Sequence, residues 1–399
     1  MSDTMRAEIV GSIDTIPSAV WNSCAGDGNP FVRHGFLAAI ENSRSAAGET
    51  GWLPRHVILK DDGGEIVAVA PMYVKSHSYG EYVFDWGWAE AYARAGGRYY
   101  PKLQCAVPFT PVAGPRLLVR HDDDSLRLAL GETMTRLADQ AGMSSVHVTF
   151  CSDAEASILE SQGYLRRLGS QYHWENRAYG TFEHFLDQLA SRKRKQVRKE
   201  RQAVAAQNLS ITTLVGADIK ARHWDYFHRF YESVVDRKWG SAYLNREFFD
   251  LLSMSEVGDD VVLVWVEQDG QPLASAFNML GGDTLYGRTW GVRPGAETPF
   301  LHFEACYYRA IDFAIAHDLA RVEAGAQGEH KVARGYLPRA THSAHWIRDP
   351  GLRQAVAKFL AHERQLLAED MAEQEAAGPF SQKVCTPCIA TPEGPESPY

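Results

Sequence analysis

Cysteine is scarce in this chain of 399 residues, and its six cysteines are scattered. Only Cys385 and Cys388 lie close together, so the spacing gives no disulfide framework and favours reduced thiols in a cytoplasm. That pair stands in a Pro-rich terminus and could be half of a metal site or a redox pair. An isolated pair is weak evidence for either function.

Apolar runs long enough to cross a membrane are also missing. No uncharged stretch approaches the roughly 20 residues that a bilayer requires, and residues 1–20 lack the basic start and apolar core of a signal peptide. The net charge of −9 argues against general coating of DNA, although a local basic patch can exist in an acidic protein. We therefore expect a cytoplasmic protein with no transmembrane segment.

Hydrophobic residues, at 45% of the chain, are plentiful enough for a packed interior, and the length predicts two or three domains. Three stretches occur twice, in the same order. The clearest pair is "QGYLRRLGSQYHW" (162–174) and "RGYLPRATHSAHW" (334–346), in which Gly335 follows Gly163, and His345 follows His173, by the same 172 residues. The other pairs are 64–71 with 270–277 and 136–150 with 309–324.

The repeats indicate one α+β fold written twice. Each copy begins with a hairpin around an Asp-Gly turn and continues with strands and helices, so a mostly antiparallel sheet with helices packed on it is expected. We predict domains at 1–178 and 207–371, each with its own sheet, a basic helical connector at 179–206 and a disordered tail at 372–399.

The connector is predicted to be one long helix, and seven of the ten residues 192–201 are Lys or Arg. Such a run is most often a solvated face, but it is also suited to phosphate-rich material such as tRNA or to an anionic membrane surface. The candidate nucleic-acid contacts are Arg192, Lys193, Arg194, Lys195, Arg198 and Lys199.

The stretch "GAQGEHKVARGY" (325–336) combines glycines with a cluster of charge. Lys331 and Arg334 are three residues apart and would share one face of a helical turn. The alternative to a functional site is a solvated turn with ordinary ion pairs.

This stretch, together with "LHFEACYYRAIDFAIAH", "SRKRKQVRKERQ" and residues 83–118, resembles the FemAB-like family of the GCN5-related N-acyltransferase (GNAT) superfamily. The resemblance covers about residues 10 to 365. It implies two tandem GNAT-like domains and amide formation between an activated acyl group and an amine. Fem transferases take amino acids from aminoacyl-tRNA to peptidoglycan precursors, so aminoacyl-tRNA is the expected donor.

In that family a Lys, commonly flanked by aromatics, sits near the reacting carbonyl, and Lys331 matches it with His330 and Arg334 in the flanking places. We expect Lys331, Glu329 and His330 to be catalytic, through oxyanion stabilisation and proton transfer. The remaining expected substrate contacts in the second copy are Arg334, Gln327, Gly325, Gly328, Glu323, Arg288, Trp290 and Glu304. For the last three, core packing or helix capping is an equally good explanation.

In the first copy, residues 99–116 form a stretch rich in Pro and aromatics. Long loops in compact domains are usually functional, so Lys102, Arg116 and Tyr100 are candidate contacts for an acceptor, unless the loop only covers the sheet.

A coenzyme A donor is the first alternative. Residues 291–308 lack the glycine-rich loop that grips pyrophosphate and contain Pro294 and Pro299, which have no amide hydrogen to donate. The second alternative is a non-catalytic protein that recognises cell-wall precursors. No histidine spacing matches a zinc pattern, so we expect no metal and no tightly bound cofactor.

Overall fold

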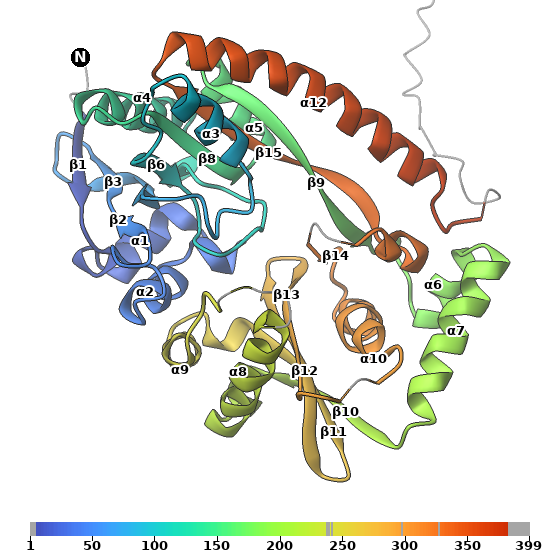
Figure 1. Cartoon of the computed structure of the whole chain (residues 1–399). Helices are drawn as coiled ribbons and strands as arrows, with labels where there is room; N and C mark the ends of the chain where they lie inside the picture. Colours follow the sequence, from blue (N-terminus) through green and yellow to red (C-terminus); the bar gives the residue numbers. More distant parts are fainter. Residues whose placement is uncertain (1–4, 237–239, 241, 297, 326–327, 382–399) are drawn as a thin grey trace, which may run out of the picture.

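The computed structural model describes residues 5–236, 240, 242–296, 298–325 and 328–381. Two sheets and the helices that cover them make up this part of the chain (Figure 1). The small sheet has the strand order β1 (Arg6–Val10), β3 (His56–Lys60), β4 (Ile66–Ala70) and β7 (Leu118–Val119).

The large sheet has eleven strands and runs through both repeats without a break. Its order is β10 (Leu209–Val215), β11 (Val261–Gln268), β12 (Gln271–Gly281), β13 (Thr284–Val292), β14 (Arg321–Glu323), β9 (Leu165–Glu175), β15 (Leu337–Ile347), β8 (Ser145–Cys151), β6 (Lys102–Cys105), β5 (Met72–Lys75) and β2 (Trp52–Pro54).

The two repeats exchange their last strands, and this exchange joins the sheet. β9 pairs with β14 of the second repeat, and β15 pairs with β8 of the first. β9 and β15 also pair with each other, and Gly169 lies opposite its own repeat equivalent, Thr341. An approximate two-fold axis therefore passes through that pair. A Cβ on Gly169 would lie 2.8 Å from Thr341 Oγ1, so a larger residue at the axis would force the Thr341 side chain to move.

The repeated Gly-Tyr motif explains how each exchanged strand begins. Gly163 and Gly335 both have positive φ, at 87° and 96°, which turns the chain into β9 and β15. The tyrosines that follow are buried, and each donates a hydrogen bond to a helix carbonyl: Tyr164 to Gly131 and Tyr336 to Tyr307. The predicted class, α+β with two tandem GNAT-like domains, is confirmed, but separate sheets were the wrong expectation.

Helices cover both sheets. In the first repeat they are α1 (Ser18–Ala25), α2 (His34–Asn42), α3 (Trp86–Arg94), α4 (Asp124–Gln140) and α5 (Asp153–Ser161). In the second they are α8 (Ala221–Asp236), α9 (Arg246–Met254), α10 (Leu301–Phe303), a π-helical turn (Glu304–Tyr308), α11 (Arg309–Ala316) and the 3-10 turn η7 (Glu329–Arg334). The last helix, α12 (Pro350–Ala376), lies along β9 and β15 (Figure 1).

The connector differs from the single helix that we predicted. It forms α6 (Phe182–Gln188) and α7 (Ser191–Ala205), because Leu189 leaves the helix to pair with Phe380 and is buried there. This contact, with α12 reaching Ala376, also shows that ordered structure continues past residue 372, where we predicted the tail to begin.

The two repeats also share a hydrophobic core. One cluster joins Trp21, Phe31 and Phe36 of the first repeat to Trp224 and Phe277 of the second. Neither repeat can therefore lose its structure without exposing apolar surface of the other.

We predict that the whole protein unfolds in urea as one cooperative unit, because the exchanged strands and the shared core make each repeat complete the other. Tryptophan fluorescence and far-ultraviolet circular dichroism should give coincident transitions. Two separated transitions would show that the repeats are energetically independent.

Candidate active site

The candidate site lies where strands β13 and β14 separate. They pair in parallel at only three positions, from Thr284–Arg321 to Tyr286–Glu323. Beyond Tyr286, β14 ends and β13 bulges at Arg288, since Phe277 faces Thr289 while Asn278 faces Gly287. A bulge inserts one residue and bends its strand, so the two strands diverge and leave a cleft.

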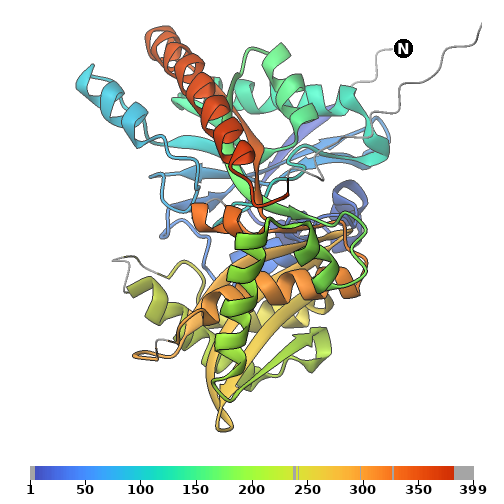
Figure 2. The ribbon, with the colours of Figure 1, turned by 90° about the vertical axis from the view of Figure 1, so that its right-hand side faces the viewer.

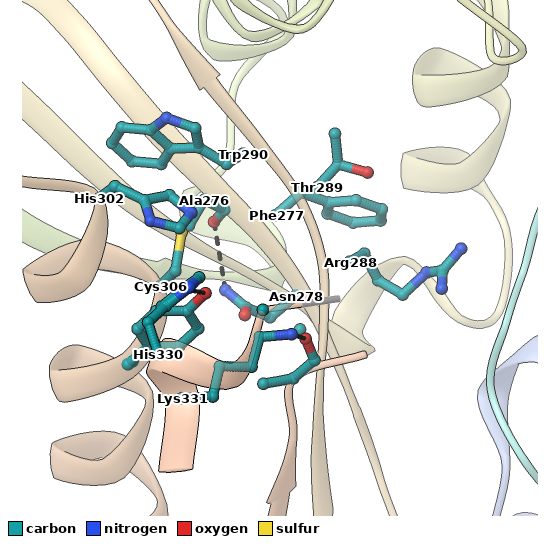
Figure 3. Close-up of a pocket in the computed structure, with 14 residues that line it drawn as sticks. Ala276, Phe277, Asn278, Arg288, Thr289, Trp290, His302, Cys306, His330 and Lys331 are labelled. Carbon is teal, nitrogen blue, oxygen red and sulfur yellow. Dashed lines mark hydrogen bonds between the residues drawn. The ribbon is translucent and has the colours of Figure 1, made fainter. Parts of the chain in front are cut away.

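The cleft opens into two cavities. The first, of about 440 Å³, lies toward the helix that follows β13, and its walls include Asn278, Thr289, Trp290, Cys306, His330 and Lys331 (Figure 3). Asn278 is fixed there by hydrogen bonds to the carbonyls of Val262 and Ala276, both of 3.2 Å. Burial raises the pKa of the Cys306 thiol, so this wall residue is not a thiolate nucleophile.

The second cavity, of about 470 Å³, has aromatic walls from both repeats: Tyr82, Phe84, Phe109 and Phe150 from the first, and Tyr231, Tyr243 and Trp290 from the second. The two cavities share Arg288, Thr289, Trp290, His302, Ala324 and Lys331. They are therefore the two ends of one passage, and Lys331 lies where the ends meet.

Lys331 is buried, and its ammonium group is held in place. Nζ donates hydrogen bonds to the carbonyls of Ala324 and Gly325, the latter at 3.1 Å. The ring of Tyr172 lies 5.6 Å from Nζ. Because an ammonium group has three N–H bonds, one remains for a group in the passage. Burial lowers the pKa of Lys331 to about 8, so the group is still mostly protonated at neutral pH.

His330 lines the first cavity beside Lys331 and stays exposed. Its Nε2 lies 3.1 Å from the hydroxyl of Tyr307. Burial and the nearby Arg334 and Lys331 lower its pKa, so the imidazole is neutral at pH 7 and can accept a proton. Gly328, with φ of 101°, approaches this ring so closely that a Cβ would lie 2.3 Å from it.

Two expected residues of the turn have no described side chain. Gln327 lies outside the described residues, and so does the side chain of Glu329. Their expected roles, as a hydrogen-bond donor and as a base, stay predictions. Gly325 lines the second cavity and contributes the carbonyl that Lys331 binds.

Arg334 does not face the passage as we expected. Its guanidinium is buried and donates to both oxygens of Glu200, at 2.8 and 2.9 Å, and to the carbonyl of His330. It also stacks on Phe303, with 3.5 Å between Cζ and the ring centroid. These partners use the donors that a phosphate would need. Arg334 instead fixes the turn of Lys331 against α7, and the sequence gives no signal that pairs residues 134 positions apart.

The side chains of Glu304 and Glu323 also lie outside the passage. The carboxylate of Glu304 is buried in the π-helical turn and binds Arg201 and Arg309, at 3.0 and 2.9 Å. It therefore anchors α7 rather than a substrate. Glu323 lies one residue before Ala324, but its side chain lines a separate cavity.

Arg288 and Trp290 both line the passage, but the bulge turns them in different directions, and Arg288 points away from Lys331 (Figure 3). The guanidinium of Arg288 donates to the carbonyl of Phe109, at 2.8 Å. Its burial lowers its pKa to about 10. Arg288 therefore ties the second repeat to the first.

The three residues expected from the first repeat are not at an acceptor surface. Lys102 is buried and donates to Ser78, Glu81 and Asp85, at 3.0, 2.7 and 2.5 Å. Tyr100 shares the same Ser78 hydroxyl, at 2.8 Å. The carboxylates of Glu81 and Asp85 balance the lysine charge, so Lys102 belongs to the interior, and the half-buried Tyr100 is bound to the same cluster.

Arg116 holds residues 106–117, here called the strap, across the end of β8. Its guanidinium donates to the carbonyls of Val112 and Thr149, at 2.6 and 3.0 Å, and it is buried. Glu155 accepts the amides of Arg116 and Leu117. The strap lies where β6 and β8 would separate, so it closes the first repeat's cleft, while Phe109 walls the passage of the second.

The basic helix α7 lies in the green part of the ribbon in Figure 2. Its apolar residues Val197 and Val204 are buried. Arg194 pairs with Asp187 and Arg198 with Glu183. Lys193 is half-buried, whereas Arg192, Lys195 and Lys199 are exposed and form no ion pair with a described residue. Arg198 is exposed as well but paired, so Arg192, Lys195 and Lys199 are the exposed cations of α7 that are not paired with a described residue.

No helix in the described ranges is long and apolar enough to cross a membrane. Within the same ranges, no group of three or more His, Cys, Asp and Glu side chains is placed to hold a metal ion.

Strand exchange between two copies of one α+β unit, with a cleft at diverging parallel strands, defines the fold of two tandem GNAT-like domains. The family model for peptidoglycan biosynthesis/recognition, FemAB-like, matches residues 12–382, and the chain belongs to this family. Among solved structures, FemX matches with a TM-score of 0.54 and 11% identity, over 88% of this chain and 100% of that one. L-PGS from Bacillus licheniformis matches with a TM-score of 0.53 and 10% identity, over 89% and 99%. At these identities the likeness shows a common fold. No curated protein matches the sequence.

We predict that Arg334→Ala lowers the free energy of unfolding by about 3–5 kcal/mol, because it leaves the buried carboxylate of Glu200 without its partner. Urea unfolding measures this change. The control is Arg348→Ala, whose exposed pair with Asp139 should contribute less than about 1 kcal/mol. Equal stability of the two variants would contradict this prediction, because it would mean that the Glu200 carboxylate loses no stabilisation when Arg334 is removed.

Proposed function

We propose that this protein is an N-acyltransferase that forms an amide between an activated acyl or aminoacyl group and an amine. The observation that carries the proposal is the passage between β13 and β14, with the buried Lys331 lining both of its ends and donating two of its three N–H bonds to protein carbonyls. Two substrates can enter from opposite ends and react beside a fixed positive charge.

The chemistry follows from these positions. A neutral amine attacks the acyl carbonyl, a C–N bond forms, and the carbonyl oxygen becomes an oxyanion that accepts a hydrogen bond from Lys331. The bond to the carrier then breaks, and the carrier oxygen takes a proton. His330 is the candidate that accepts the proton lost by the amine, because it is neutral and lines the first cavity beside Lys331, which belongs to both cavities. That proton can then pass to the carrier oxygen.

Aminoacyl-tRNA is the favoured donor. The exposed cations of α7 provide a surface for a nucleic-acid backbone, and Glu200 on the same helix binds Arg334 of the reaction turn. The loop before α10 contains Pro294 and Pro299, which have no amide hydrogen, so this loop offers fewer amides for a pyrophosphate. An acyl-coenzyme A donor is thus the second choice.

The acceptor amine enters, in this proposal, through the aromatic cavity. Among the described residues that line it, the Lys and Arg side chains are Arg288 and Lys331, and both donate hydrogen bonds to protein carbonyls. The cavity therefore favours an amine next to an apolar or aromatic group. The family's link to peptidoglycan makes a cell-wall precursor the class to test first, and we propose a cytoplasmic location together with it.

We predict that Lys331→Met reduces turnover at least tenfold, because it removes the oxyanion donor but preserves the packing of the aliphatic chain. Turnover of the unaltered protein should fall above pH about 8, where Lys331 loses its proton. Rates measured with a mixture of aminoacyl-tRNAs or with acetyl-coenzyme A, and a range of amines, test both effects. Lys358→Met serves as a control on α12, remote in sequence from the turn. Full turnover by Lys331→Met would reject the assignment.

For the helix, we predict that Lys195→Glu combined with Lys199→Glu weakens tRNA binding and makes it less dependent on salt, because fewer counterions are released. Thermal stability should change little, since both side chains are exposed. Filter binding at several salt concentrations measures the slope. The matched control reverses the charge of two exposed arginines outside α7: Arg136→Glu in the first repeat combined with Arg348→Glu after β15. An unchanged slope would leave α7 as a solvated face.

A further inference from the structure

Four aromatic side chains of the first repeat are exposed within one short segment, between the end of β5 and the first turn of α3. They are Tyr79, Tyr82, Phe84 and Trp86, which are 58%, 39%, 54% and 46% exposed, and they are here called the aromatic platform. Single apolar residues are common on protein surfaces, but a group of large ones marks a place where a ligand or partner binds.

The rings of the platform contact one another and lie beside the passage. Phe84 stacks on Trp86 with 5.0 Å between ring centroids, and the centroid of Tyr79 lies 5.8 Å from that of Trp86. Because each of these three still exposes about half of its surface, their mutual contacts leave ring area open to a ligand. Tyr82 and Phe84 also line the second cavity, so the platform continues the aromatic wall of the passage outward.

Buried charges hold the platform in place from the interior. Lys102 donates to three buried side chains that alternate with the exposed rings along the segment: Ser78, Glu81 and Asp85. Lys75 donates to the backbone carbonyl of Tyr79 at 3.2 Å. Tyr82 has a φ of 59°, a left-handed conformation that is uncommon for a residue other than glycine and persists only where its surroundings impose it. The rings are therefore displayed at fixed positions.

The charges around the platform indicate which ligand it suits. Residues 76–93 contain no Lys or Arg. Arg94, in the last turn of α3, pairs with Glu90, and Arg167, which donates to the backbone of the platform at 2.7 Å, pairs with Glu363. A nucleotide or an anionic membrane carries phosphate charge and binds best where cations are free to meet it. The platform therefore favours a ligand that is neutral and has a ring to stack.

We propose that the aromatic platform binds a neutral sugar ring, a pyranose of the acceptor that stays outside while the acceptor amine enters the aromatic cavity. The C–H bonds on one face of a pyranose carry partial positive charge, and the face of an aromatic ring carries partial negative charge, so the two stack without an ion pair. This assignment rests on the proposed function, in which a peptidoglycan precursor is the acceptor to test first. Sugar rings and a peptide amine are both parts of such a precursor.

Binding of diacetylchitobiose, a neutral disaccharide of N-acetylated pyranoses, to the full chain tests the proposal. With tryptophan labelled by the heavy stable isotope of nitrogen, Trp86→Phe identifies the indole resonance of Trp86 in nuclear magnetic resonance spectra. That resonance should shift and saturate with the disaccharide, but not with sorbitol, which has hydroxyl groups and no ring. Adenosine monophosphate and phosphatidylglycerol vesicles should leave it unchanged. No acyl donor is present, so the result does not depend on whether transfer occurs.

Tyr79→Ala and Phe84→Ala should each weaken disaccharide binding by about fivefold or more, because each removes one aromatic contact. The control Tyr226→Ala removes an exposed ring from α8 and should leave the affinity within about twofold of the unaltered protein. The remaining tryptophan resonances report whether each variant is folded. The proposal is overturned if the disaccharide does not shift the Trp86 resonance, if the nucleotide or the vesicles do, or if both platform variants keep full affinity. A dimer in sedimentation that Phe84→Ala dissociates would overturn it as well.

Discussion

The pairing of β9 with β15 is the constraint on which the rest of the molecule depends. Because each strand also completes the sheet of the other repeat, the two copies cannot move apart as separate domains. Their relative position is fixed by backbone hydrogen bonds rather than by side-chain contacts alone. That rigidity lets the strap of the first repeat form a wall of a cavity in the second, where a shift of 1 Å would change its shape.

The two copies of one fold have become unequal through a few side chains. In the first, Arg116 and Glu155 hold the strap over the end of β8, and the charges of Lys102, Glu81 and Asp85 fill the interior. In the second, the bulge at Arg288 keeps the strands apart, and Lys331 occupies the opening. The proposed chemistry therefore belongs to the second copy, and the first has a supporting role in that proposal.

The repeats, the hairpins and the fold class could be predicted from the sequence because each is written in local patterns. The strand exchange could not, since "QGYLRRLGSQYHW" reads the same whether β9 joins its own sheet or the other. The turn of Lys331 was found by its glycines and charges. The burial of Arg334, Lys102 and Arg116 was not, because their partners lie far away in the sequence. The aromatic cavity was missed for the same reason: Tyr82, Phe109 and Tyr243 come from three distant segments.

The ion pair of Glu200 with Arg334 couples the position of α7 to the position of the turn that carries Lys331. It ties one turn of α7 to the segment that carries Lys331, so a force on the outer face of the helix is transmitted to the ammonium group through two side chains. When a carrier docks along α7, part of its binding energy would hold the ammonium group in its reactive position. A shortened carrier that keeps only the acyl end would lack this contribution, so it would react slowly even when it is bound. In such a protein, the length of the carrier would set the rate as well as the affinity.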